Sequence, residues 1–190
     1  MKKAARVVRD SSIKKIHAPL SGKDIKSLAA GSVVLLSGTI YTARDQAHLR
    51  FTKNTEHSRR FPVDLKGQVI YYSGPTPQGK RVIGSCGPTT SGRMDNFTPA
   101  ILDAGVKGII GKGRRSKKVR EALKKAGAVY FLAPSGAGAY LSEKVKSSEV
   151  VAFKDLGPEA VYRLEVRDFP LIVGIDAKGN DIYERLNRQI

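Results

Sequence analysis

Lys107-Gly108-Ile109-Ile110-Gly111 and Ala128-Val129-Tyr130-Phe131-Leu132 are two short apolar runs that flank one amphipathic segment, Ser116 to Ala126. Short apolar runs next to glycines are typical of buried strands. The segment between them has apolar residues at helical spacing and is followed by Gly127, a common helix stop. Strand, helix and strand in this order predict the α/β class.

The alternation continues toward the N-terminus, where helix and strand patterns follow one another. Helices are predicted at Ser21–Ala30, Ala43–Lys53 and Met94–Ala104, and strands at Ser32–Ile40 and Gln68–Tyr72.

The C-terminal part differs, because after one helix at Ser135–Val145 the strands come without helices between them. The predicted strands are Glu149–Phe153, Val161–Val166, Leu171–Ile175 and a last short one after the turn Asp176–Asp181, and Asp155–Tyr162 and Val166–Pro170 are predicted as structural turns. Strands joined in this way pair antiparallel, so a mixed sheet flanked by helices is expected.

Composition indicates one globular domain spanning residues 1–190, with residues 1–20 as a candidate N-terminal arm. No apolar run approaches the roughly 18 residues that a membrane span needs. Met1–Arg6 is basic but no apolar stretch follows it, so no signal peptide is expected and a cytoplasmic location is the default. Cys86 is the only cysteine, which excludes an internal disulfide.

The formal net charge of +17 raises the possibility of nucleic acid as a partner. Only Gly113–Arg120 is densely basic, and its helical pattern favours a solvated helix face. No zinc-finger spacing or aromatic RNA-binding motif is present, which disfavours nucleic acid. Positive charge also suits small dianions or an acidic partner subunit.

The segment Gly84–Asp95 combines glycines, a proline, hydroxyl residues and Arg93 before a helical pattern. Helix N-termini attract anions, and an arginine can fork a carboxylate. The segment therefore predicts an anion pocket, with an N-capped turn and a surface arginine as the alternative.

Two further junctions have similar chemistry. Lys112 lies between glycines beyond a buried strand, without the residues of a phosphate-binding P-loop, and can bind a carboxylate, act as an acid or base, or be an exposed turn residue. Arg44 lies beside a helix start, where Asp45 and His48 are three residues apart and form either a surface pair or part of a site. One His and one Asp are an incomplete metal-ligand set, and nothing places a base near Cys86, so no metal site and no nucleophilic cysteine are expected.

These motifs closely resemble the β subunit, equivalently the C-terminal domain, of the class I fumarase and L-tartrate dehydratase family of iron–sulfur hydro-lyases. The resemblance extends from about Gly31 to the C-terminus. The matching stretches are Gly38–Ile40, Ala43–Asp45 with Ala47–His48, Tyr71–Pro75, Gly87–Asp95, Ile110–Gly113, Phe153–Ala160 and Glu165–Pro170.

The resemblance implies a swivelling β/β/α domain and the reversible hydration of a carbon–carbon double bond. Hydration of fumarate to (S)-malate, a reaction of the tricarboxylic acid cycle, is the first expectation on the general ground of central metabolism, and dehydration of tartrate is the alternative. In the family a larger α subunit or domain holds a [4Fe–4S] cluster on cysteines, so an α-subunit partner in a heterodimer or heterotetramer is expected here. The open iron of that cluster acts as a Lewis acid.

The resemblance also implies roles for particular residues. Thr89 and Lys112 correspond to the family's proposed catalytic dyad, in which the threonine removes the C3 proton and the lysine assists. Arg44 and Arg93 correspond to its substrate-carboxylate arginines. Asp45 and His48 align with the same substrate-binding motif without a defined role.

Overall fold

The computed structural model describes residues 13–56, 62–79 and 81–187, and in these residues seven strands form one sheet in the order β1-β2-β3-β4-β5-β7-β6. The strands are β1 (Lys14–Ala18), β2 (Val33–Thr42), β3 (Val69–Tyr71), β4 (Gly108–Gly111), β5 (Val129–Leu132), β6 (Val145–Ala152) and β7 (Val161–Ile175). The helices are α1 (Gly22–Ser27), α2 (Asp45–Glu56), α3 (Thr98–Asp103), α4 (Lys117–Ala126), α5 (Gly138–Glu143) and α6 (Ile182–Asn187), with 3₁₀ turns η1 (Ser91–Met94) and η2 (Lys154–Glu159).

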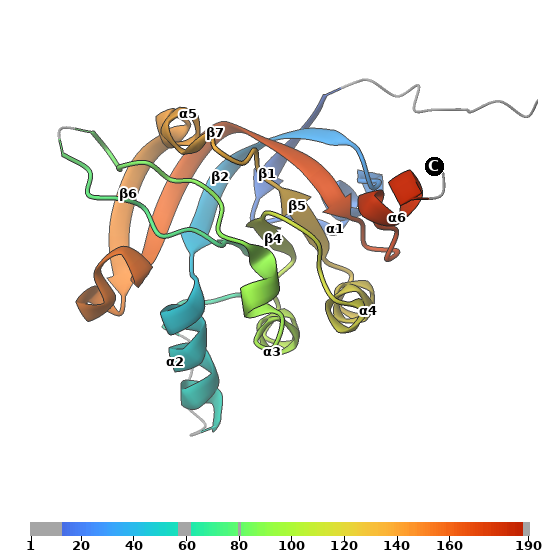
Figure 1. Ribbon diagram of the computed structural model, residues 1–190, viewed down its shortest axis with the longest axis horizontal. Coiled ribbons are helices and arrows are strands. Elements are labelled where there is room, and N and C mark those ends of the chain that lie inside the picture. The colour runs from blue at the N-terminus through green and yellow to red at the C-terminus, as the bar shows by residue number, and fades with distance from the viewer. Residues whose placement is uncertain (1–12, 57–61, 80, 188–190) are drawn as a thin grey trace, which may run out of the picture.

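Strands β1 to β5 run parallel to one another, and α2, α3 and α4 lie side by side along one face of the sheet (Figure 1). Because side chains alternate along a strand, β3 and the residue after it contribute to two separate cores. Val69 and Tyr71 belong to the core on the face away from these helices. Ile70 and Tyr72 belong to the core that the helices cover.

Strand β7 turns the parallel sheet into a mixed one. It pairs antiparallel with β2 and β6 along most of its length and with β5 near its end, so the sheet closes on itself. The predicted α/β fold, a swivelling β/β/α domain with a mixed sheet flanked by helices, is confirmed.

The ends of α4 and α1 are fixed by local capping interactions. The Ser116 hydroxyl accepts a hydrogen bond from the Val119 amide at the start of α4, and Gly127 ends it with a left-handed φ of 59°. Ser21 caps α1 in a reciprocal capping box with Asp24.

Strand β7 contradicts the predicted turn at Val166–Pro170, because Val161–Ile175 is a single strand. Its backbone bends at Asp168, which has a φ of 49°, and the Asp168 amide donates to the Ser37 hydroxyl (3.1 Å) beside a register shift in β2. A bulge of this kind holds polar residues and a proline within a strand.

One other prediction, at the C-terminal end of the chain, was wrong. The predicted last strand is only a bridge between Ile175 and Asp181, since an Asp181 carboxylate oxygen accepts from the Tyr183 amide (2.9 Å) where α6 begins. In the candidate N-terminal arm, Lys14–Ala18 form β1 beside β2, and residues 1–12, including the basic N-terminus, lie outside the described residues. No helix in the described ranges has both the length and the apolar character to cross a membrane.

Candidate active site at the carboxyl ends of the parallel strands

The carboxyl ends of β2, β3 and β4 meet at one edge of the sheet, where ligands collect in open α/β folds. Backbone hydrogen bonds continue past the strand ends and hold the three following loops together. The Ala43 amide donates to the Tyr71 carbonyl (3.0 Å), and the Tyr72 amide donates to the Ile110 carbonyl (2.8 Å). The Thr89 amide donates to the Tyr72 carbonyl (2.6 Å), which brings the predicted anion segment to the same edge.

Thr89 and Lys112 are brought close together by backbone pairing. Thr90 and Lys112 form a parallel bridge, and the Ser91 amide donates to the Lys112 carbonyl (3.0 Å). In return the buried Ser91 hydroxyl accepts from the Lys112 amide (3.1 Å). Both Thr89 and Lys112 remain partly exposed, so their side chains are accessible at this edge. Thr90 is at the start of η1, but its side chain makes no capping hydrogen bond, unlike in the N-capped-turn alternative.

Gly111 allows this close pairing. A Cβ atom at Gly111 would lie 1.9 Å from the Ser91 hydroxyl oxygen and 3.3 Å from the Tyr72 ring. The glycine before Lys112 is therefore needed for packing rather than for phosphate binding.

Arg44 and Arg93 converge on one carboxylate. The Arg93 guanidinium makes two contacts with Asp45, at 3.0 Å from Nε and 2.9 Å from Nη2. The Arg44 Nε lies 3.2 Å from the Asp45 Oδ2 atom. Arg93 is about half exposed and Arg44 about one quarter exposed, so both guanidiniums can still reach a bound ligand.

Glu159 is a member of this cluster that the sequence patterns did not reveal. One carboxylate oxygen lies 3.4 Å from Arg44 Nη2 and the other accepts from the Gln46 amide (2.9 Å) at the first turn of α2. Glu159 lies in the segment predicted as a purely structural turn. The only feature of the sequence that pointed to a role in the site was its place in a stretch that matches the family. On the other side of Arg44, a Cβ at Gly74 would lie 3.0 Å from Arg44 Cδ, so Gly74 leaves room for the arginine.

His48 does not lie on this surface. Its side chain is fully buried among the rings of Phe51, Tyr72 and Phe97. Nδ1 lies 2.9 Å from the Arg44 carbonyl oxygen, and since a carbonyl only accepts, Nδ1 carries the proton. Burial is the main cause that lowers the pKa of His48 to about 4, so the ring is neutral at pH 7. His48 therefore cannot contact a ligand that lies on this surface.

Cys86 is buried and held against the end of β3. Its carbonyl accepts from the Tyr71 hydroxyl (2.6 Å), and its sulfur lies 3.5 Å from the Ser73 hydroxyl. Burial raises the pKa of the Cys86 thiol to about 11, which keeps it protonated. The part of the chain that the structure describes has no group of three or more His, Cys, Asp or Glu side chains that could hold a metal ion.

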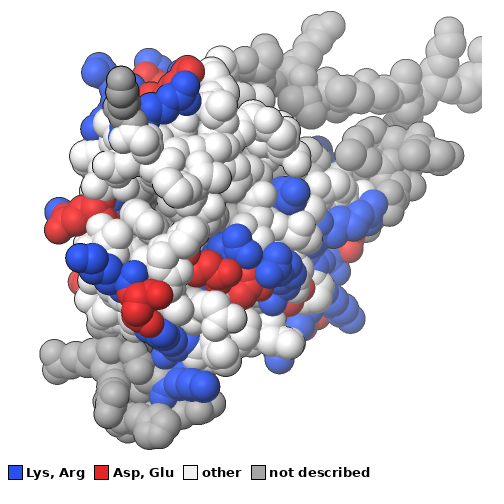
Figure 2. Space-filling model, turned by 60° about the vertical axis from the view of Figure 1, so that its left-hand side comes forward, with Lys and Arg blue, Asp and Glu red and all other residues white. Residues whose placement is uncertain are grey.

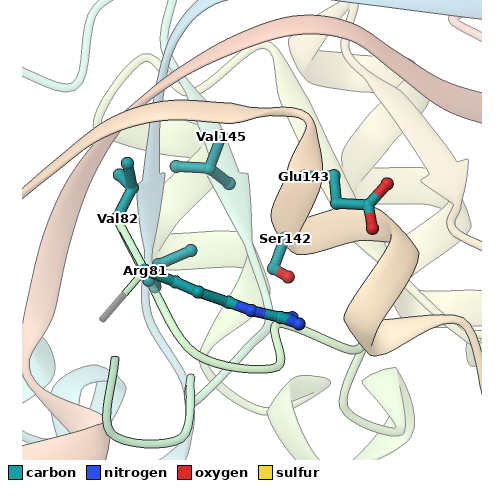
Figure 3. A pocket seen from close by; sticks show the side chains of 6 residues that line it. Arg81, Val82, Ser142, Glu143 and Val145 are labelled. Atoms are coloured by element: carbon teal, nitrogen blue, oxygen red, sulfur yellow. The ribbon is translucent and has the colours of Figure 1, made fainter. Parts of the chain in front are cut away.

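Two hollows on the surface of the described residues are lined by residues other than those of the site. One of about 460 Å³ lies between the loop before Cys86 and the α5–β6 junction; Figure 3 shows the Arg81 side chain extending across it toward Ser142. The other, of about 370 Å³, is lined mainly by proline, aliphatic and hydroxyl residues that include Pro75, Pro158 and Tyr162. None of the six predicted site residues lines either hollow.

The face in Figure 2 mixes charges of both signs. Lys and Arg lie in small groups beside Asp and Glu, and a broad uncharged area separates the upper group from the lower ones. This face has no continuous basic surface of the kind that follows a nucleic-acid backbone.

Comparison with known proteins shows the family of this chain. The family model described as "Fumarase C-terminus" matches residues 2–186. A protein of Methanocaldococcus jannaschii, provisionally named L(+)-tartrate dehydratase subunit beta, is 41% identical over 178 residues, which cover 90% of this chain and 91% of that protein.

Two fumarate hydratases are also similar. The aerobic class I fumarate hydratase of Escherichia coli K12 is 37% identical over 187 residues, which cover 96% of this chain and 33% of that protein. Fumarate hydratase 2 of Leishmania major is 39% identical over 167 residues, which cover 86% of this chain and 29% of that protein. The chain thus spans about a third of these longer relatives and nearly all of the shorter one. It belongs to the fumarase C-terminal domain family.

Proposed function

We propose that this chain is the β subunit of a [4Fe–4S]-dependent hydro-lyase that acts on a small dicarboxylate. One observation carries the proposal: Arg44 and Arg93, from loops far apart in the sequence, converge on Asp45 at the edge where Thr90 pairs with Lys112. The names of the relatives, which are fumarate hydratases and a tartrate dehydratase subunit, support the same class of reaction.

The two arginines are proposed to bind the substrate carboxylates. A guanidinium recognises a carboxylate through paired, charge-assisted hydrogen bonds, and Arg93 already makes two contacts of this kind with Asp45. Asp45 is proposed to orient both guanidiniums. A substrate carboxylate is proposed to bind them beside Asp45 or in its place. His48 is proposed to position Arg44 without contacting the substrate, because its buried ring donates a hydrogen bond to the Arg44 carbonyl.

Thr89 and Lys112 are proposed to exchange the C3 proton. In the dehydration direction the Thr89 oxygen takes that proton, the C2 hydroxyl group leaves as hydroxide, and the proton that Lys112 took from Thr89 converts this hydroxide to water. A threonine hydroxyl is a weak base, so a neighbouring amine must first accept its proton, and Lys112 is the nearby candidate. The pairing of the two loops supports a fixed distance between them.

The cluster does not fit the residues of this chain. Cluster irons are bound by several cysteine thiolates. The sequence has one cysteine, and that thiol is buried with a raised pKa. The proposal therefore assigns the cluster to a partner α subunit, as the "subunit beta" in the name of the M. jannaschii relative suggests. A cytoplasmic heterodimer or heterotetramer is the proposed assembly.

Fumarate hydration to (S)-malate is the first candidate reaction, and tartrate dehydration is the second. The fumarate hydratases favour the first, and the relative of matching length favours the second. Co-expression with a cysteine-bearing α subunit, anaerobic cluster reconstitution and assays with malate and tartrate separate them. The chain alone is expected to be colourless and inactive as a hydro-lyase. A brown and active preparation of the isolated chain would contradict the partner-subunit proposal.

The net charge of +17 is the observation that favours nucleic-acid binding as a second function. Binding of duplex DNA by the isolated chain, measured at rising salt, tests it. Affinity that persists at physiological salt would support this function, whereas loss of binding there would leave the charge to attract dianions or an acidic subunit.

A further inference from the structure

Arg115 stands apart from the other basic residues of its segment. The sequence pattern predicted a solvated helix face for Gly113–Arg120, and the Lys117 side chain is indeed 80% exposed. The Arg115 side chain is instead 0% exposed, although it lies only two residues earlier. A buried charge is costly unless it is paired and hydrogen-bonded, so its partners show what it holds together.

The polar partners of Arg115 all come from the segment after η1. Its Nε donates to Asp95 Oδ1 (2.8 Å), and its Nη2 donates to the Thr98 hydroxyl (2.6 Å). The other Asp95 oxygen accepts from the Ser116 amide (2.8 Å). These bonds tie the start of α4 to the segment that follows Arg93.

The Arg115 guanidinium lies over two tyrosine rings. Its central carbon lies 5.1 Å from the Tyr130 ring centre and 5.5 Å from the Tyr72 ring centre, as in cation–π contacts. The Tyr130 hydroxyl lies 3.0 Å from the Ser91 hydroxyl, which accepts from the Lys112 amide. A continuous set of contacts therefore runs from Arg115 to the backbone of Lys112.

We propose that Arg115 is a positioning residue, which fixes the Thr89–Arg93 segment against the loop that carries Lys112. It does not touch the substrate, because its guanidinium is enclosed below that surface. An effect of Arg115 on turnover rests on the proposed function. If Thr89 and Lys112 exchange a proton, Arg115 sets the distance between them. A guanidinium is needed for this, since a lysine ammonium cannot bond Asp95 and Thr98 in the same plane.

The test uses Arg115→Lys in the enzyme assembled with its α subunit, with Lys118→Met on the exposed side of α4 as the matched control. We expect kcat to fall about 10- to 100-fold in Arg115→Lys, because small displacements of reacting groups have large effects on rate. KM is expected to change by less than about threefold, since the Arg93 guanidinium keeps its two contacts with Asp45. Lys118→Met is expected to behave as wild type.

Hydrogen exchange provides a second measurement that does not depend on activity. The amides of Ser91 and Lys112 are expected to exchange about tenfold faster or more in Arg115→Lys, while amides paired between β2 and β7 keep their wild-type rates. If Arg115→Lys fails to fold, Asp95→Asn removes charge from the same contact and is measured in the same way.

The outcomes separate the two proposals. Faster exchange at Ser91 and Lys112 together with a lower kcat supports the positioning role. Wild-type exchange at both amides, or a wild-type kcat in Arg115→Lys, overturns it. If the assembled wild-type enzyme acts on neither malate nor tartrate, the proposed function fails, and the exchange rates alone decide whether Arg115 holds the two segments together.

Discussion

The surface layer formed by Arg44, Asp45 and Arg93 and the buried layer formed by His48, Tyr72 and Arg115 have similar chemistry and opposite environments. In the surface layer two guanidiniums share one partly exposed carboxylate, and both remain accessible. In the buried layer a neutral histidine and a paired guanidinium both lie against the Tyr72 ring. The difference in burial matches the two proposed roles, in which the exposed arginines bind the ligand and the buried Arg115 holds other groups in position.

Catalytic substitutions should give the largest effects and should leave stability almost unchanged. We expect Thr89→Ala and Lys112→Ala in the assembled enzyme each to lower kcat by about 10²- to 10⁴-fold with little change in KM. The double variant should be little worse than the poorer single variant, because the two residues act as one unit. Steady-state kinetics with denaturant unfolding of the same variants checks this.

Thr90→Ala is the matched control for these two variants. Thr90 is exposed and makes no capping hydrogen bond, so both turnover and stability should stay near wild type. Multiplicative losses in the double variant, or a Thr90 effect as large as that of Thr89, would show that the proton-exchanging pair is misassigned.

His48 should affect the pH dependence of stability. Its pKa is about 4 in the folded chain and 6.5 in an unstructured peptide, so the unfolded chain binds the extra proton between these values. The free energy of unfolding should therefore fall as pH decreases from 6.5 to 4, by up to about 3 kcal/mol from this residue. Protonation would place a cation in the field of Arg115 as well, although Asp45 partly opposes that effect.

The comparison of wild type with His48→Asn isolates this contribution, since carboxylates also titrate below about pH 5. Urea unfolding of both proteins at several pH values measures it. A difference between the two proteins that stays constant from about pH 7 to about pH 4 would contradict a neutral, buried His48.

The strand–helix order from β2 to β5, and the places of Arg44, Arg93 and Lys112 beyond strand ends, could be predicted from the sequence because they depend on local patterns. Apolar runs, Ser116 and Gly127 mark the ends of elements by short-range chemistry. Arg115 and Glu159 could not be predicted in this way. Their burial and pairing depend on contacts with residues that are distant in the chain. The bend in β7 was missed for a similar reason, since Ser37 on another strand provides its hydrogen bond.

The surface arginines should affect binding more than turnover. Losing a charge-assisted pair to a carboxylate typically costs about 1.5–3 kcal/mol. We therefore expect Arg44→Ala and Arg93→Ala each to raise KM by about one to two orders of magnitude, as measured by initial rates against substrate concentration. Arg93→Lys should recover part of the loss, because the charge remains while the paired geometry is lost. Wild-type kinetics in both alanine variants would place the substrate elsewhere.

Gly111 tests the contact between the buried layer and the paired loops of Ser91 and Lys112, because an added Cβ would lie close to both the Tyr72 ring and the Ser91 hydroxyl. The methyl group of Gly111→Ala would overlap that hydroxyl at 1.9 Å, so Ser91 must rotate and give up its bond to the Lys112 amide. Overpacking of this kind typically lowers the free energy of unfolding by about 1–3 kcal/mol. Gly92→Ala is the matched control, since nothing lies within 4 Å of its added Cβ. Urea unfolding should show a loss for Gly111→Ala and almost none for Gly92→Ala. Equal stabilities would mean that Ser91 adapts freely, and the close pairing of the two loops would then not depend on the glycine.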